Sequence, residues 1–134
     1  MVQTAVLGYG TVGSGVVKVI DTNHDSILAK AGVCAKAGSI SEAARKLDAY
    51  DTIYVGYPIW WFNAPMAIGS FLESYDLSGK TIVPFCTSQD NGIDVSMDYI
   101  RKNAKNAEVL EGHRIHNSDS AEIKAWLKEI GTIS

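Results

Sequence analysis

Short apolar runs alternate with segments of helical periodicity along most of the chain. The runs are rich in Val, Ile and Tyr, which favour strands, and in the segments between them apolar residues recur every three or four positions. This alternation is typical of a parallel β-sheet whose strands are joined by crossover helices. The predicted strands are 4–7, 33–37, 52–57, 81–86 and 109–115, and the predicted helices are 12–31, 41–47, 65–75, 95–104 and 120–129.

These elements predict an α/β fold, a three-layer α/β/α sandwich around a five-stranded parallel sheet. Right-handed crossovers restrict the strand order. The loops after the first, third and fourth strands carry the residues best suited to a ligand, and the order 2-1-3-4-5 brings these loops together at the switch point between strands 1 and 3. We therefore expect one domain over residues 1–134, with a ligand site outside the carboxyl ends of the strands.

Composition and charge exclude several classes of protein. The net charge is −3 and the 12 basic residues are dispersed, so no basic stripe is available for nucleic acid. Apolar stretches are interrupted well short of the ~20 residues that cross a bilayer, and no signal peptide follows Met1, which favours a cytoplasmic protein with no membrane partner. Cys34 and Cys86 show no CxxC spacing and are expected to be reduced.

A glycine-rich loop follows the first predicted strand. Three glycines in the spacing G-x-G-x-x-G allow a tight turn, a close approach of the backbone to a phosphate, and close packing of helix on strand. Amide groups at the start of the following helix would then bind the anion. A tight βα turn without a ligand is the alternative interpretation. The predicted phosphate-binding residues are Gly8, Tyr9, Gly10, Thr11, Val12, Gly13 and Ser14.

Two later loops suit the flat, amphipathic ring of a flavin. Such a ring needs aromatic or apolar walls on its faces and backbone donors and acceptors along its edge. Because consecutive residues leaving a strand point to opposite sides, we expect one indole of "IWW" to pack against the following helix and Trp61 to face the ring; both indoles in the core is the alternative. The candidate residues are Pro58, Ile59, Trp60, Trp61, Phe62 and Asn63 in one loop, and Thr87, Ser88, Gln89, Asn91 and Gly92 in the other.

The segments "YDTIYVGYPIWWFNAPM", "FLESYDLSGKTIVPFCTSQDNGI" and "AEVLEGHRI" closely resemble bacterial flavodoxins of the P-I-W-W type, over about residues 48–131. The resemblance implies a flavodoxin-like sandwich, bound FMN and transfer of single electrons. Phe62 stands where such proteins often have Gly, near the flavin N5. Their phosphate loop is usually rich in Ser and Thr, whereas the first loop here is rich in Gly.

Residues 3–33 resemble instead the Rossmann NAD(P)-binding start of homoserine dehydrogenase. A Rossmann site uses an acidic residue at the end of its second strand to hold a ribose, and that region here reads "VCAKAGSIS". NAD is therefore disfavoured, although Lys36 and Ser39 could face the 2′-phosphate of NADP. The catalytic part of that family has no counterpart, so dehydrogenase activity is not expected. Two resemblances that meet near 33–39 favour an engineered chimera of a Rossmann-type segment, 1–38, and a flavodoxin-type segment, 39–134.

The resulting expectation is a flavodoxin-like FMN-binding domain for electron transfer. The alternatives are a folded scaffold that carries little or no cofactor and a weak NADP-binding module. Asp90, Asp94 and Asp98 would suit a basic redox partner, or form a solvated helix face. The histidines lack clustered thiolates or carboxylates, so we predict no metal site.

Overall fold

The computed structural model describes residues 3–7, 34–38, 47–116 and 120–133, with the backbone alone for the first two ranges. Its strands form one parallel sheet with the order β2-β1-β3-β4-β5, and β6 also pairs with β4. The α/β fold with a parallel sheet and the predicted strand order are confirmed. The strands are β1 (Gln3–Leu7), β2 (Cys34–Gly38), β3 (Thr52–Pro58), β4 (Thr81–Thr87), β5 (Glu108–Val109) and β6 (His113–Arg114).

Three of the predicted helices lie among the described residues and form close to their expected bounds. They are α4 (Met66–Ser74), α5 (Asp94–Asn103) and α6 (Ser120–Glu129). The predicted helix 12–31 lies outside the described residues, as does most of 41–47, after which a short 3-10 helix η1 (Leu47–Ala49) leads towards β3. None of the helices in the described part of the chain has the length and apolar composition that crossing a bilayer requires.

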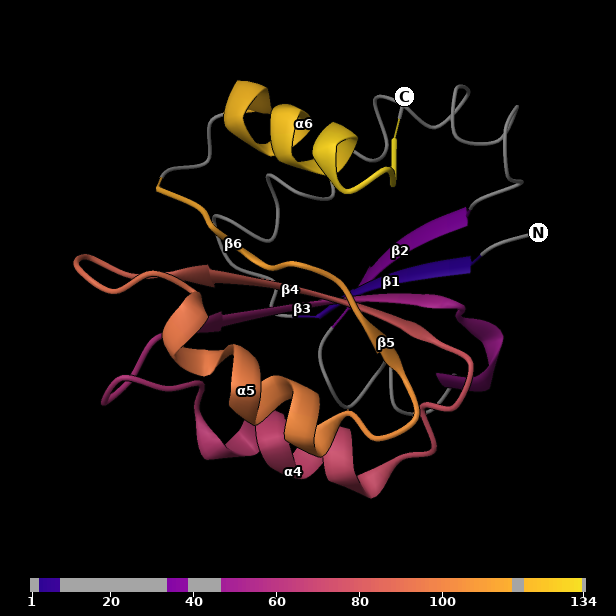
Figure 1. Cartoon of the computed structure of the whole chain (residues 1–134). Helices are drawn as coiled ribbons and strands as arrows, with labels where there is room; N and C mark the ends of the chain where they lie inside the picture. Colours follow the sequence, from indigo (N-terminus) through magenta and orange to yellow (C-terminus); the bar gives the residue numbers. More distant parts are fainter. Residues whose placement is uncertain (1–2, 8–33, 39–46, 117–119, 134) are drawn as a thin grey trace.

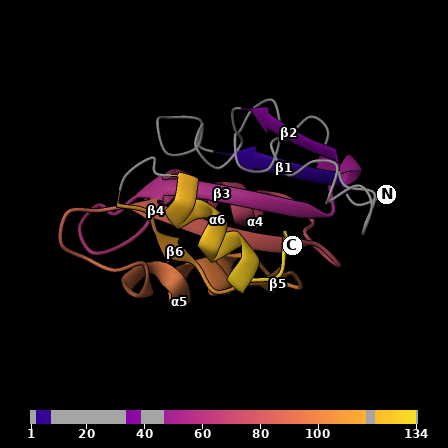
Figure 2. The ribbon, with the colours of Figure 1, turned by 90° about the horizontal axis from the view of Figure 1, so that it is seen from above.

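Helices cover both faces of the sheet, which gives the predicted three layers. Figure 1 shows α4 and α5 side by side below the strands and α6 above them, and Figure 2 places α6 over the β3–β4 half of the sheet. Because side chains alternate along a strand, β3 contributes side chains to the packing on both faces of the sheet. Ile53 and Val55 belong to the core between the sheet and the helices α4 and α5, whereas the ring of Tyr54 lies edge-on to Trp126 of α6.

The last predicted strand, 109–115, is interrupted between β5 and β6, and the sequence did not predict this break. In a parallel ladder, the bond from Leu110 N to Ile82 O (2.9 Å) would be followed by a bond from residue 84 N to Leu110 O. Residue 84 is Pro and has no N–H to donate. The partner strand therefore bulges between β5 and β6, with one more residue than β4 has between the paired positions, and regains its pairing with β4 at His113.

Candidate functional site

The loop after β3 is a tight aromatic turn. Trp60 and Asn63 exchange two backbone hydrogen bonds, with N–O distances of 2.8 and 3.1 Å, and the two residues between them have positive φ, +51° at Trp61 and +61° at Phe62. This is the geometry of a type I′ turn, which normally selects Asn and Gly. The turn is anchored at both ends, because Ile59 N donates to Thr87 O of β4 (3.2 Å) and Asn63 Oδ1 accepts from Ala64 N (2.8 Å).

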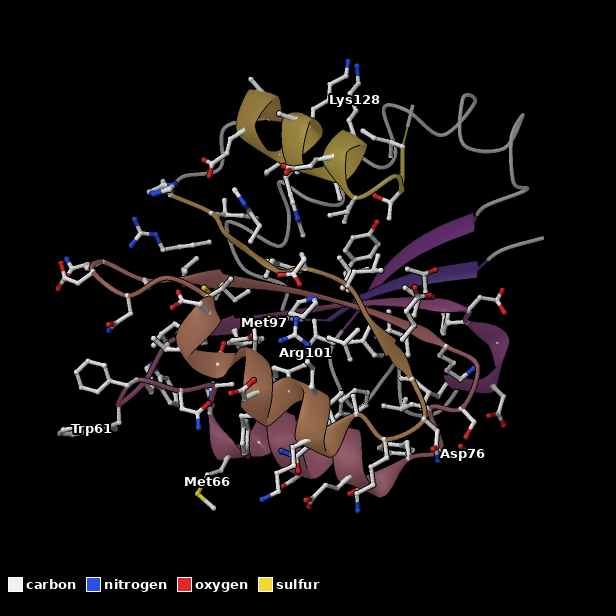
Figure 3. The ribbon with its side chains drawn as sticks, in the orientation of Figure 1. Trp61, Met66, Asp76, Met97, Arg101 and Lys128 are labelled. Carbon is white, nitrogen blue, oxygen red and sulfur yellow. The ribbon has the colours of Figure 1, made fainter. Side chains whose placement is uncertain are left out.

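The aromatic side chains of this turn project into solvent. Trp60 is 61% exposed, Trp61 95% and Phe62 68%, and Met66 at the start of α4 is also exposed. Figure 3 shows Trp61 at the tip of the loop beyond the carboxyl end of β3. The expectation that one indole packs against the following helix is therefore wrong, as is the alternative of two core tryptophans. The reversal of the backbone at 61 and 62, rather than strand alternation, sets the direction of these side chains.

The loop after β4 lies beside this turn, since β3 and β4 pair up to Pro58 and Thr87. It closes on itself through Ser88, whose Oγ accepts from Asn91 N (3.0 Å). Thr87 and Gln89 are exposed, and Asn91 and Gly92 are half-buried. The two loops that the sequence analysis selected are thus brought together at the carboxyl ends of adjacent strands.

The third predicted part of the site, residues 8–14, lies outside the described residues. The strand that precedes it, β1, ends at Leu7 and runs parallel to β3, with Leu7 paired to Val55. Its carboxyl end therefore points to the same edge of the sheet as the two described loops.

A buried network of hydrogen bonds lies beneath the loops, and the sequence did not predict it. Tyr57 at the end of β3 and Ser96 in the first turn of α5 are joined side chain to side chain at 2.9 Å, and Ser96 Oγ donates to Ile93 O (2.8 Å). Since the Ser96 proton is used on Ile93, Tyr57 is the donor to Ser96. Burial raises the pKa of Tyr57 to about 12.

Cys86 lies next to Tyr57 in the sheet and is fully buried. Burial raises the pKa of its thiol to about 11, and the charge of Arg114 opposes the shift. A buried, protonated thiol is neither a nucleophile nor a metal ligand at neutral pH. Among the described residues, no group of His, Cys, Asp and Glu side chains is arranged to hold a metal ion.

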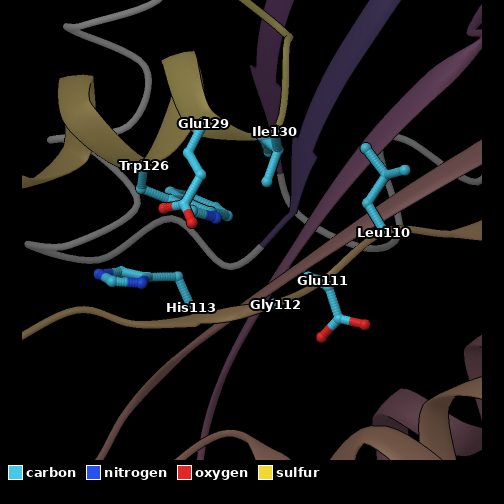
Figure 4. A pocket seen from close by; sticks show the side chains of 7 residues that line it. All are labelled: Leu110, Glu111, Gly112, His113, Trp126, Glu129 and Ile130. Atoms are coloured by element: carbon cyan, nitrogen blue, oxygen red, sulfur yellow. The ribbon is translucent and has the colours of Figure 1, made fainter.

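A hollow lies away from these loops, between α6 and the interrupted strand (Figure 4). Its volume is about 440 Å³, and the rings of His113 and Trp126 stack within it with centroids 5.5 Å apart. None of the predicted cofactor residues lines it. The bulge opposite Pro84, residues 110–112, forms part of its wall. The described lining residues are Leu110, Glu111, Gly112, His113, Trp126, Glu129 and Ile130.

Comparison with known proteins settles the family. A family model described as Flavodoxin matches residues 14–130. The chain belongs to the flavodoxin family. This single match continues through 33–39, where a junction was expected, so the comparisons give no support to a homoserine dehydrogenase fragment or to a chimera. No curated protein matches the chain.

Solved structures agree on the fold of this flavodoxin family member. A proposed flavoprotein from Bacteroides eggerthii is 24% identical with a TM-score of 0.64, and the match covers 96% of each chain. A second, from Bacteroides uniformis, is 22% identical with a TM-score of 0.70 over 95% of this chain and 97% of the other. A Fusobacterium nucleatum flavodoxin bound to flavin mononucleotide is 14% identical, with a TM-score of 0.59 over 96% and 95% of the two chains.

Proposed function

We propose that this flavodoxin family member binds FMN at the carboxyl ends of β1, β3 and β4 and carries single electrons. The observation that carries the proposal is the aromatic turn. Trp61 and Phe62 keep a backbone conformation that bulky residues rarely adopt, and their rings face solvent, where they gain nothing from the core. Exposed rings held by an anchored turn supply the wall that a flat cofactor requires.

The residues divide into three roles around the cofactor. The turn 60–63 would cover the ring, the loop 87–92 would offer polar groups to its edge, and residues 8–14 would bind the phosphate through main-chain amides. When bound, the flavin supplies the redox chemistry, while the chain orients the ring and limits its contact with water. With an aromatic wall for a ring and no acid after strand 2 for the ribose of NAD, the site favours FMN over NAD.

Titration of the purified chain with FMN tests this function. We expect a red-shifted, resolved flavin spectrum and quenched fluorescence. In thermal melts, FMN at 100 times its dissociation constant should raise stability by about 2.7 kcal/mol. An unchanged flavin spectrum at millimolar FMN, or tighter binding of NAD or NADP, would contradict the proposal.

Replacement of Trp61 tests the aromatic wall without removing a side chain from the core. Trp61→Ala should weaken FMN binding by about two- to tenfold, because an aromatic pair contributes about 0.5–1.5 kcal/mol and 1.4 kcal/mol is a factor of ten. Tyr75→Ala is the matched control, since Tyr75 is a partly exposed aromatic residue just after α4 and outside the two loops. Calorimetric titration of both variants decides, and equal FMN affinity in the two would remove the turn from the site.

The glycine loop has a test of its own. Gly10→Val should abolish phosphate binding, because a side chain there would fill the space that the anion needs. Trp61→Ala should leave the binding of inorganic phosphate or sulfate unchanged. A Gly10→Val variant that keeps the FMN affinity of the parent would place the phosphate elsewhere.

A redox partner with a basic surface fits the rim of this site. Asp90, Asp94 and Asp98 are all exposed next to the second loop. Charges of one sign at a rim steer association with a partner of the opposite sign, and the effect weakens with salt. Electron-transfer rates that fall as ionic strength rises would support such a partner.

A further inference from the structure

Arg114 connects the candidate cofactor loop to α6. It lies at the end of β6, paired with Cys86 at the end of β4. Its Nη1 donates to Asn91 O in a long contact of 3.4 Å. Asn91 is thereby held on both sides, because its N–H donates to Ser88 Oγ and its carbonyl accepts from Arg114. The guanidinium therefore reaches the loop 88–92 through the carbonyl of Asn91.

The guanidinium is itself held by His116. Arg114 Nη2 lies 2.8 Å from His116 Nε2, and His116 Nδ1 lies 3.0 Å from Glu122 Oε1 in the first turn of α6. A guanidinium can only donate, so His116 Nε2 must be the acceptor and carry no proton. The proton of the neutral ring is then on Nδ1 and is donated to Glu122.

Protonation of His116 would break this arrangement. An imidazolium has donors on both nitrogens, so its Nε2 would face the Arg114 guanidinium with a proton and a positive charge. The contact with Glu122 would survive and become an ion pair. Histidine is in general the side chain suited to a charge change between about pH 5 and 8, so a contact that requires the neutral ring is a candidate for control by pH.

Other charges surround these groups. His113 Nε2 also lies 3.0 Å from Glu122 Oε1, so one carboxylate oxygen serves two imidazoles. Burial raises the pKa of Glu122, but the hydrogen bonds from His116 and His113 outweigh it and lower the pKa below its ordinary value. The carboxylate therefore stays charged well below neutral pH. On the β4 side, the charge of Arg114 lowers the pKa of the Cys86 thiol, and the charge of Asp94 at the start of α5 raises it.

We propose that Arg114 is a positioning residue for the loop 88–92 and that His116 controls it. Neutral His116 holds Arg114 against Asn91, and protonated His116 releases it. The loop is ordered at neutral pH and loosens as His116 takes up a proton. The consequence for FMN affinity rests on the proposed function, but the behaviour of the loop does not.

NMR on the protein without cofactor tests the proposal. Across pH 5 to 8, the backbone amides of Asn91 and Gly92 should shift with the same midpoint as the His116 ring, and the exchange protection of the loop should fall about fivefold below that midpoint. His116→Asn keeps an acceptor and a donor but cannot be protonated, so its loop should stay ordered and insensitive to pH. Arg114→Gln should have the loosened loop at every pH.

His113→Asn is the matched control. The His113 side chain shares the Glu122 oxygen with His116, but the ring nitrogen that Arg114 Nη2 meets belongs to His116, so this variant should keep the pH response of the loop. Loop amides that ignore the titration of His116, or a response that disappears in His113→Asn and persists in His116→Asn, would overturn the proposal.

FMN titrations separately test whether the loop affects the affinity for the cofactor. The dissociation constant should rise about fivefold in the wild type below the His116 midpoint, and should stay constant with pH in His116→Asn. If FMN does not bind at all, the proposed function fails while the amide measurements still decide the role of Arg114. If FMN binds with no such pH dependence, the link between Arg114 and the cofactor is wrong.

Discussion

At the scale of single residues, the aromatic turn is the most informative feature. The left-handed region costs a residue with a side chain about 1–2 kcal/mol, and bulky residues are rare there. This chain has Trp61 and Phe62 in that region, where Gly or Asn would relieve the strain. Strain of this kind is typical of sites where side-chain position matters more than stability.

The strain is measurable by comparing two variants at one position. Phe62→Gly and Phe62→Ala both remove the ring, but only Gly adopts positive φ freely, so the Gly variant should be the more stable by about 1 kcal/mol. The order should reverse at Ser70, exposed in α4, where Ser70→Gly should be about 1 kcal/mol less stable than Ser70→Ala. Urea denaturation gives both differences, and the same order at the two positions would contradict a left-handed Phe62.

At the scale of elements, the Tyr57–Ser96 bond fixes the end of β3 against the start of α5. Both loops of the candidate site leave from this region, so a buried hydrogen bond here serves to hold the site as well as the core. Buried polar pairs of this kind contribute about 1 kcal/mol net, and they are costly to leave half-satisfied.

Tyr57→Phe should lower the free energy of unfolding by about 1 kcal/mol at neutral pH, because the phenol bond is lost while Ser96 keeps its bond to Ile93 O. A double-mutant cycle with Ser96→Ala, followed by urea denaturation, should show coupling of about 0.5–1 kcal/mol. Additive losses in the two single variants would show that the pair contributes nothing beyond its separate parts.

The bulge between β5 and β6 requires a residue without a side chain. A Cβ on Gly112 would lie 3.0 Å from Pro84 O, 3.1 Å from Met97 Sδ and 2.5 Å from Ile93 Cδ1. Gly112→Ala should therefore destabilise the protein by about 1–3 kcal/mol. Gly92→Ala is the matched control, because its Cβ would meet the flexible, exposed side chain of Asp94. Equal thermal stability of the two variants would contradict the close packing at the bulge.

At the scale of the whole molecule, buried titratable groups set the pH range of stability. Burial raises the pKa of Tyr54 to about 12, with a side-chain hydrogen bond to Thr132 opposing the shift, and burial likewise raises the pKa of Tyr57 to about 12 and of Cys86 to about 11. The folded state thus keeps protons that the unfolded state loses from about pH 9 to 10 upwards. Their stabilisation is complete below that range and lost as pH rises through 11 to 12.

We therefore expect the free energy of unfolding to fall steeply between pH 10 and 12. Each pKa unit corresponds to about 1.4 kcal/mol, so each buried tyrosine accounts for a loss on the order of 2–3 kcal/mol across this range. Tyr57→Phe should be less stable than the wild type at pH 7 but lose less stability above pH 10. Urea denaturation at pH 7, 10 and 11.5 measures this, and an alkaline slope unchanged by the substitution would contradict the burial of the phenol.

On the acid side, Glu122 acts with the opposite sign. Its pKa is lowered in the folded state, so its stabilisation is present above the ordinary glutamate pKa and is lost as pH falls through the lowered value. Glu122→Gln should be less stable than the wild type at pH 6, and the difference should shrink as the pH is lowered to 3. A difference that stays constant with pH would show that the carboxylate charge is not responsible.

The sequence by itself determined the elements of the described part and their order. The periodicities that predict β3, β4, α4, α5 and α6 arise from residues that are neighbours in sequence. The handedness of crossovers restricted the strand order, and the position of the three ligand-type loops selected 2-1-3-4-5. Because parallel strands end at one edge of the sheet, the sequence also identified the two loops, 58–63 and 87–92, that the structure brings together.

Tertiary structure alone decided how those loops are held and what they expose. The break at Leu110 depends on Pro84 in a neighbouring strand, and the contact of Arg114 with Asn91 joins residues that are far apart in the chain. The exposure of Trp60 and Trp61 depends on a backbone reversal that residue types with a low preference for positive φ do not predict. Such features follow from pairing and packing between distant segments, which no periodicity along a single segment encodes.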